Sequence, residues 1–205
     1  MTTATPVERL TRALDATDAL IAAVGNDQWS NLTPCPEWNV RTLVNHLVFG
    51  NRLIANTLRG ESPQALENLR QMRDADQLGD DPLAVYREAG TALQAAFSQP
   101  NVLESIFPAP VGAVPGAVLL HLRITELLVH GWDLARATGQ PVQLPEDLAE
   151  EELAFARSPL APDVPRTGHP FGPTQVIADD APAIDRLAAY LGRPITPSPS
   201  GPDRV

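Results

Sequence analysis

Three side chains that can bind a metal ion or transfer a proton lie within one largely apolar stretch, ITELLVHGWDLARATG, at residues 124–139. They are Glu126, His130 and Asp133. In an α-helix, Glu126 and His130 are four residues apart and share one face, and Asp133 lies within about 60° of both. An isolated buried carboxylate is costly, so another group must offset the charge of Glu126.

Ion pairing within the helix is the simplest way to offset this charge. Arg123 precedes Glu126 by three residues, and His130 precedes Asp133 by three, so each pair can meet on one face. Neighbouring polar side chains are a second way. Either interpretation would make the segment a buried helix of a plain helical protein whose polar groups satisfy one another.

A divalent metal ion is the third way to offset the charge. Glu and His at positions i and i+4 can bind one metal, as in other helical metal motifs. Two ligands from one helix are too few, so another helix must supply a third. His46, in the apolar segment VRTLVNHLVFG, is the candidate, although a lone histidine in an apolar helix is more often a hydrogen-bonded core residue.

Four amphipathic helices are expected to position these residues. Apolar residues recur every three or four positions in each predicted helix, and Pro, Gly or Asn stands near many of the helix ends. Such helices joined by loops predict an all-α four-helix bundle, with a short extended stretch at most between residues 99 and 116. The predicted helices span residues 6–24, 40–59, 83–98 and 117–138.

The remaining residues are expected to form a C-terminal extension. We predict a bundle domain over 1–141 and an extension over 142–205, with short helices near 146–157 and 183–191. The intervening residues are rich in Pro and Gly, and the tail TPSPSGPDRV is expected to be disordered.

Composition excludes several classes of function. The formal net charge of −10 argues against nucleic acid or an anionic membrane as the main partner, because both need a basic surface. The chain has no lysine, which excludes Schiff-base chemistry and a P-loop lysine. No apolar run is long enough to span a membrane, and we read no signal peptide, so we expect a cytoplasmic protein.

Two separated motifs resemble a known family. TPCPEWNVRTLVNHL (residues 33–47) and ELLVHGWDLARATGQ (126–140) are similar to actinobacterial metal-binding proteins related to mycothiol-dependent maleylpyruvate isomerase, within the DinB-like superfamily. The segment FGPTQVIADDAPAIDRLAAYLGR (171–193) resembles the tail of members of the same group.

The resemblance implies a DinB-like four-helix bundle that binds zinc through His46, Glu126 and His130. Asp133 is then expected to hold the second ring nitrogen of His130, and Arg123 to orient a carboxylate; a helix-end pair between Asp133 and Arg136 is the alternative for Asp133. Imidazole and carboxylate ligands also suit nickel, iron and manganese. The isomerase has a larger C-terminal α/β domain, which this chain is expected to lack or replace, so the resemblance does not imply the isomerase's substrate.

Three functions are compatible with these residues. The first is a metal- and thiol (mycothiol)-dependent transferase or isomerase that acts on a small electrophilic substrate, either as a monomer or as a homodimer. The second is a non-catalytic metal-binding or stress-related accessory protein. The third is the plain helical protein without a metal.

The other reactive and aromatic side chains are expected to have structural roles. Cys35, the one cysteine, is expected to be a small packed residue, with a redox thiol or an extra ligand as alternatives. Trp38 and Trp132 are expected to be packing residues. His121 should face away from Glu126, and His169 is interpreted as a surface histidine.

Overall fold

The structure is a computed structural model that describes residues 4–36, 38–109, 112–158, 161 and 172–195. The chain is mostly helical, as predicted, with one small two-stranded sheet. The elements in chain order are α1 (Pro6–Ala22), α2 (Val40–Leu58), α3 (Pro63–Gln71), α4 (Pro82–Phe97), β1 (Ile106–Ala109), β2 (Gly112–Pro115), α5 (Gly116–Thr138), α6 (Glu146–Ala156) and α7 (Ala183–Tyr190). His169 and the predicted disordered tail, residues 196–205, lie outside the described residues.

The four long helices begin and end within two residues of their predicted positions. Local signals explain this agreement. Thr5 and Glu8 form a reciprocal capping box at the start of α1, and the side chain of Asn39 accepts a hydrogen bond from the Thr42 amide at the start of α2. Gly139 ends α5 in the left-handed conformation, with φ of 69°.

The short extended stretch expected between residues 99 and 116 is an antiparallel hairpin that leads into α5. In this hairpin Ile106 pairs with Pro115 and Phe107 with Val114. The amide of Gly116, at the first position of α5, donates to the carbonyl of Ser105. This hydrogen bond pairs one of the backbone N–H groups at the N-terminal end of α5, which has no side-chain cap.

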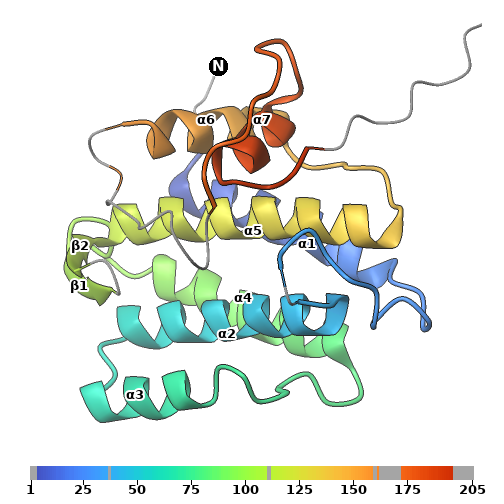
Figure 1. The fold of residues 1–205 in the computed structure, drawn as a ribbon. Coiled ribbons are helices and arrows are strands. Elements are labelled where there is room, and N and C mark those ends of the chain that lie inside the picture. Colours follow the sequence, from blue (N-terminus) through green and yellow to red (C-terminus); the bar gives the residue numbers. More distant parts are fainter. Residues whose placement is uncertain (1–3, 37, 110–111, 159–160, 162–171, 196–205) are drawn as a thin grey trace, which may run out of the picture.

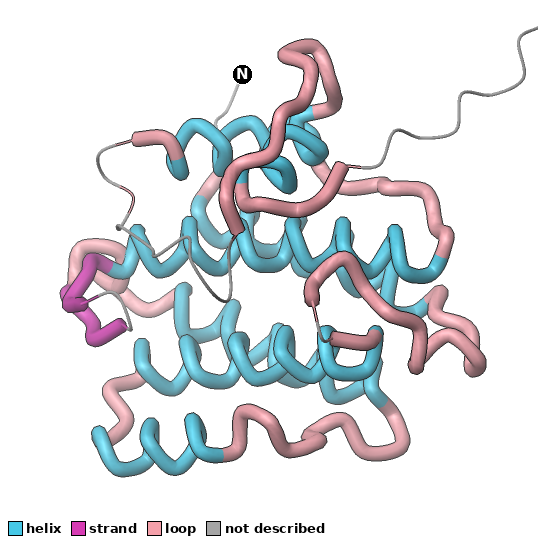
Figure 2. Tube along the Cα trace, in the orientation of Figure 1, coloured by secondary structure: helices cyan, strands magenta, loops and turns pink. Residues whose placement is uncertain are grey.

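Helix α5 runs through the middle of the molecule (Figure 1). Helices α1 and α2 both pack against α5 and α4, while α6 and α7 cover another side of α5. Figure 2 shows the helices lying beside one another, with loops joining their ends. Because neighbours surround α5, most of its residues are buried, including Leu120, Leu127 and Leu128. None of the helices within the described ranges is long and apolar enough to cross a membrane.

The C-terminal segment docks on α5 through α6 and α7. The two helices pack on each other, and Ile184 and Leu187 of α7 are buried. The indole nitrogen of Trp132 on α5 donates to Asp185 on α7 over 2.6 Å. These contacts fix the C-terminal helices against the same α5 helix that carries Glu126, His130 and Asp133.

Candidate metal centre

The structure brings the three predicted ligand residues together across two helices. His46 lies on α2, and Glu126 and His130 lie on α5. Nε2 of His46 is 3.0 Å from Oε2 of Glu126, and Nε2 of His130 is 3.3 Å from the same oxygen. One nitrogen or oxygen from each of the three residues lies within 4.8 Å of the other two.

This donor set fits a divalent metal ion. Ligands at about 2.0–2.2 Å from a tetrahedral centre are roughly 3.3–3.6 Å apart, close to the separations seen here. Two imidazole nitrogens and one carboxylate oxygen form a donor set typical of catalytic zinc sites. The rings of His46 and His130 meet edge to face at 75°, so they approach the carboxylate from different directions.

Asp133 orients the ring of His130. Its Oδ2 atom is 3.0 Å from Nδ1 of His130, which leaves Nε2 directed to Glu126. Asp133 is fully buried, so the alternative of a helix-end carboxylate paired with Arg136 is wrong. Arg136 instead lies 3.9 Å from Asp185 and over the ring of Trp132.

Burial and hydrogen bonding act in opposite directions on the ionisable groups of this cluster. Burial raises the pKa of Glu126, but hydrogen bonds from His130 and His46 outweigh it and hold that pKa well below its usual value. Burial lowers the pKa of His130, but the bonds to Asp133 and Glu126 outweigh it and raise that pKa. Burial lowers the pKa of His46. Glu126 is therefore a carboxylate at neutral pH and available as an anionic ligand.

Arg123 does not form the ion pair with Glu126 that was one of the alternatives for offsetting its charge. Its Nε donates to Oδ1 of Asn51 over 2.8 Å, and its Nη2 donates to the carbonyl of Leu47 over 3.0 Å. Both partners lie on α2, so the guanidinium is buried between two helices rather than along one. The i, i+3 spacing would allow the ion pair with Glu126. Because α2 packs against α5, the guanidinium of Arg123 instead bonds to Asn51 and Leu47.

The sequence model of the family "Mycothiol maleylpyruvate isomerase N-terminal domain" matches residues 10–135. The chain belongs to this family. It is 36% identical over 186 residues to "Uncharacterized protein Rv0738" and, to the same extent, to "Uncharacterized protein MT0763", both of Mycobacterium tuberculosis. Each alignment covers 90% of this chain and 95% of the relative.

Solved structures support the same fold. The crystal structure of the mycothiol-dependent maleylpyruvate isomerase superposes with a TM-score of 0.57 at 20% identity, over 75% of this chain and 71% of the isomerase. A histidine-to-alanine mutant of an isomerase of that name superposes with a TM-score of 0.56 at 19% identity, with the same coverage. At this level of identity the likeness concerns the fold.

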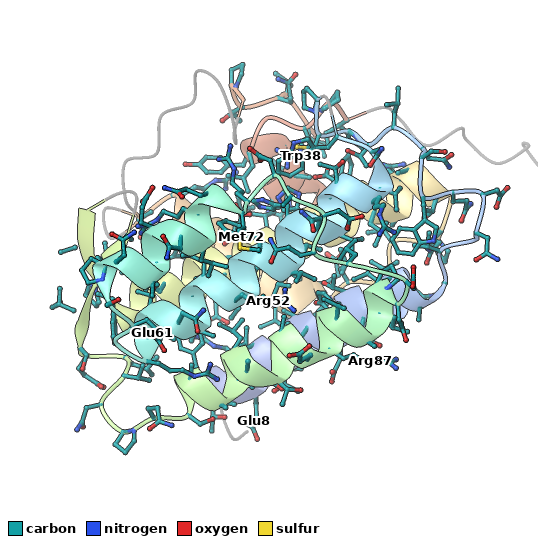
Figure 3. All side chains as sticks on the ribbon, turned by 90° about the horizontal axis from the view of Figure 1, so that it is seen from below. Glu8, Trp38, Arg52, Glu61, Met72 and Arg87 are labelled. Atoms are coloured by element: carbon teal, nitrogen blue, oxygen red, sulfur yellow. The ribbon has the colours of Figure 1, made fainter. Side chains whose placement is uncertain are left out.

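In this member of the isomerase-domain family, Trp38 forms one wall of the cluster. Its ring centroid lies 4.6 Å from that of His46 and 5.6 Å from that of His130. Figure 3 shows Trp38 in the loop before α2. Thr33 shapes this loop, because its amide donates to the carbonyl of Trp38 and its hydroxyl accepts from the amide of Cys35. The sequence predicted a packing residue; its position against both histidines was not predicted.

Cys35 is packed beside the same cluster. It is buried, and its sulfur lies within 4.8 Å of donor atoms of His130 and Asp133. Burial raises the pKa of its thiol to about 11. A neutral thiol is a weak metal ligand and a weak nucleophile, which agrees with the packed role expected for it.

Two buried charged residues near α5 were not predicted from the sequence. Arg193, which follows α7, pairs with Asp133, its Nη2 lying 2.9 Å from Oδ2. Glu152 on α6 pairs with His121, which faces away from Glu126 as predicted. Arg193 ends the segment that resembles the tail of the family, and this was the only signal that could have indicated it.

Proposed function

We propose that this chain binds one divalent metal ion, zinc in the first instance, through His46, Glu126 and His130. The ion would serve a mycothiol-dependent transferase or isomerase reaction on a small electrophilic substrate. The proposed fold is a DinB-like four-helix bundle over residues 1–141 with a C-terminal extension over 142–205. The convergence of three donor atoms from two helices, with His130 already oriented by Asp133, carries this proposal.

The cluster is accessible on one side. The side chains of His46 and Glu126 are 22% and 20% exposed, whereas that of His130 is 2% exposed. A metal ion held by these three residues would keep at least one coordination position open, as in catalytic rather than structural sites. A small ligand could reach that position from the side of His46 and Glu126.

The charges around the cluster favour an anionic ligand. Glu126 and Asp133 contribute two negative charges, and Arg123 and Arg193 contribute two positive charges. A divalent ion would leave this balance positive. When bound, such an ion would act as a Lewis acid that favours the deprotonated form of a thiol. Trp38 covers the two histidine rings and would limit the access of water from that side.

Cobalt substitution followed by titration with low-molecular-weight thiols tests the proposal. Mycothiol should produce a thiolate-to-cobalt charge-transfer band in the near ultraviolet in the parent protein. Asp133→Asn should keep the band, because Asp133 is not itself a ligand in this arrangement. Glu126→Gln should weaken or abolish it, because the substitution removes an anionic ligand.

Two results would contradict parts of the proposal. A parent protein that binds cobalt but shows no band with any thiol would favour the non-catalytic metal-binding function. A parent protein that binds neither zinc nor cobalt would support the helical protein without a metal.

A further inference from the structure

A buried arginine of the C-terminal segment, Arg193, reaches the candidate metal centre. Nε of Arg193 lies 3.1 Å from both carboxylate oxygens of Asp133, and Nη2 lies 2.9 Å from Oδ2. Oδ2 is also the atom that meets Nδ1 of His130 at 3.0 Å. Arg193 is 3% exposed and Asp133 is fully buried, so this contact is shielded from solvent.

The end of α7 directs Arg193 inward. After α7, Gly192 adopts a left-handed φ of 88°, and the amide of Arg193 donates to the carbonyl of Ala188. This is the pattern of a helix that ends in a Schellman turn. A Cβ on Gly192 would lie 2.5 Å from the backbone of Gly172, so only glycine fits there. The amide of Gly172 in turn donates to the carbonyl of Leu191.

Arg193 supplies a cation directly against the buried carboxylate of Asp133. A buried carboxylate that loses its cationic partner is strongly destabilised, and its side chain then has a reason to leave the position beside His130. Groups that hold the second nitrogen of a ligating histidine typically contribute 10–100-fold to metal affinity. Arg193 contacts Asp133, which in turn contacts this histidine.

We propose that Arg193 is a positioning residue through which docking of the C-terminal segment sets the metal affinity of the site. The order of contacts is Arg193, Asp133, His130 and then the ion. The inference rests on the proposed function, because it requires that His130 binds a metal. It makes α7 and the turn after it a part of the metal centre rather than an appendage to the helical core.

The test is a double-mutant cycle read out as zinc affinity, measured by competition with a chromophoric chelator. Arg193→Met should weaken zinc binding about 10-fold or more while the far-ultraviolet circular dichroism stays helical. In the Asp133→Asn background, Arg193→Met should have little further effect, because Arg193 acts through Asp133. A purely structural arginine would weaken binding equally in both backgrounds, and this result would overturn the inference.

Two further variants keep the test decisive. Arg186→Met removes a cation from α7 itself, where Arg186 pairs with the exposed Glu150, and should leave zinc affinity within about 2-fold of the parent. If Arg193→Met does not fold, Arg193→Lys keeps the charge but loses the two-point contact, and should weaken binding severalfold.

The inference and the proposed function fail in different ways. A parent protein that binds zinc, together with unchanged affinity in Arg193→Met and Arg193→Lys, overturns the inference alone. A parent protein that binds no zinc overturns both.

Discussion

Helix α5 carries two histidines that each meet a carboxylate but differ in what surrounds them. His130 and His121 are nine residues apart, so they point to opposite sides of the helix. His130 faces α2, where Glu126, His46 and the ring of Trp38 converge. His121 faces α6, where its Nδ1 lies 3.0 Å from the fully buried Glu152.

The pair at His121 has the features of a structural contact. The ring of His121 stacks on Phe155 with centroids 4.1 Å apart, and the hydroxyl of Thr125 donates to Glu152. Of the two histidines, only His130 shares its carboxylate with a histidine from another helix. The proposed metal centre therefore differs from the pair at His121 in having a third donor residue, His46 of α2.

The largest difference should appear in metal content. His46→Ala and His130→Ala should each reduce zinc affinity by about 100-fold or more, because each removes one of three ligands. His121→Ala should leave the affinity unchanged. Elemental analysis and chelator competition on the purified variants measure this, and equal metal content in all three variants would contradict the assignment of the two pairs.

The contact between α2 and α5 beneath the cluster gives the next largest effect. A Cβ on Gly50 would lie 2.3 Å from Nη1 of Arg123, which Asn51 and Leu47 hold in place. Gly50→Ala should therefore reduce the free energy of unfolding by about 1–3 kcal/mol and weaken zinc binding, as α2 and α5 separate.

Gly90→Ala is the matched control for Gly50→Ala. A Cβ on Gly90 would meet only the side chain of Leu14, at 3.4 Å, so this variant should be neutral or slightly more stable. Urea denaturation measures both variants. Equal stability of the two would show that Arg123 is free to move.

Substitution on the α6 side should change stability without changing metal binding. Glu152→Ala leaves Thr125 and His121 without their buried acceptor and should reduce the free energy of unfolding by about 1–3 kcal/mol. Glu150→Ala, on the same helix, removes an exposed ion pair with Arg186 and should cost less than about 1 kcal/mol. Thermal denaturation compares them; a loss of zinc from Glu152→Ala would contradict the structural role.

The smallest effect on the metal centre is expected for Cys35, which is not among the three proposed ligands. Its folded-state pKa of about 11 lies above the ordinary value, so folding favours the neutral thiol. That contribution to stability is complete at neutral pH and is lost as the pH rises through about 11. At pH 8 iodoacetamide should alkylate Cys35 at least about 100-fold more slowly in native than in denatured protein.

Intact-mass measurements follow the alkylation, with and without zinc. Zinc removal should leave the native rate slow if three residues complete the protein ligands. Rapid alkylation only after zinc removal would indicate that Cys35 is a fourth ligand.

The sequence by itself predicted the parts of this protein that depend on neighbouring residues. Helix ends follow from caps such as Thr5, Asn39 and Gly139, which act within one turn of the chain. The shared face of Glu126 and His130 follows from helix geometry, and the opposite direction of His121 follows from the same rule. His46 could be named as the third ligand because it lies near the middle of another apolar helix, which was expected to pack against the helix that carries Glu126 and His130.

The tertiary structure alone decided the partners that come from distant segments. Arg123 pairs with Asn51 and Leu47, 72 and 76 residues away, because packing of α2 on α5 leaves it no access to solvent. Arg193 meets Asp133 across 60 residues. No periodicity or spacing encodes such contacts, because each depends on how two or more elements pack together. The partner of each buried charged side chain is therefore determined by how the helices pack in the folded protein.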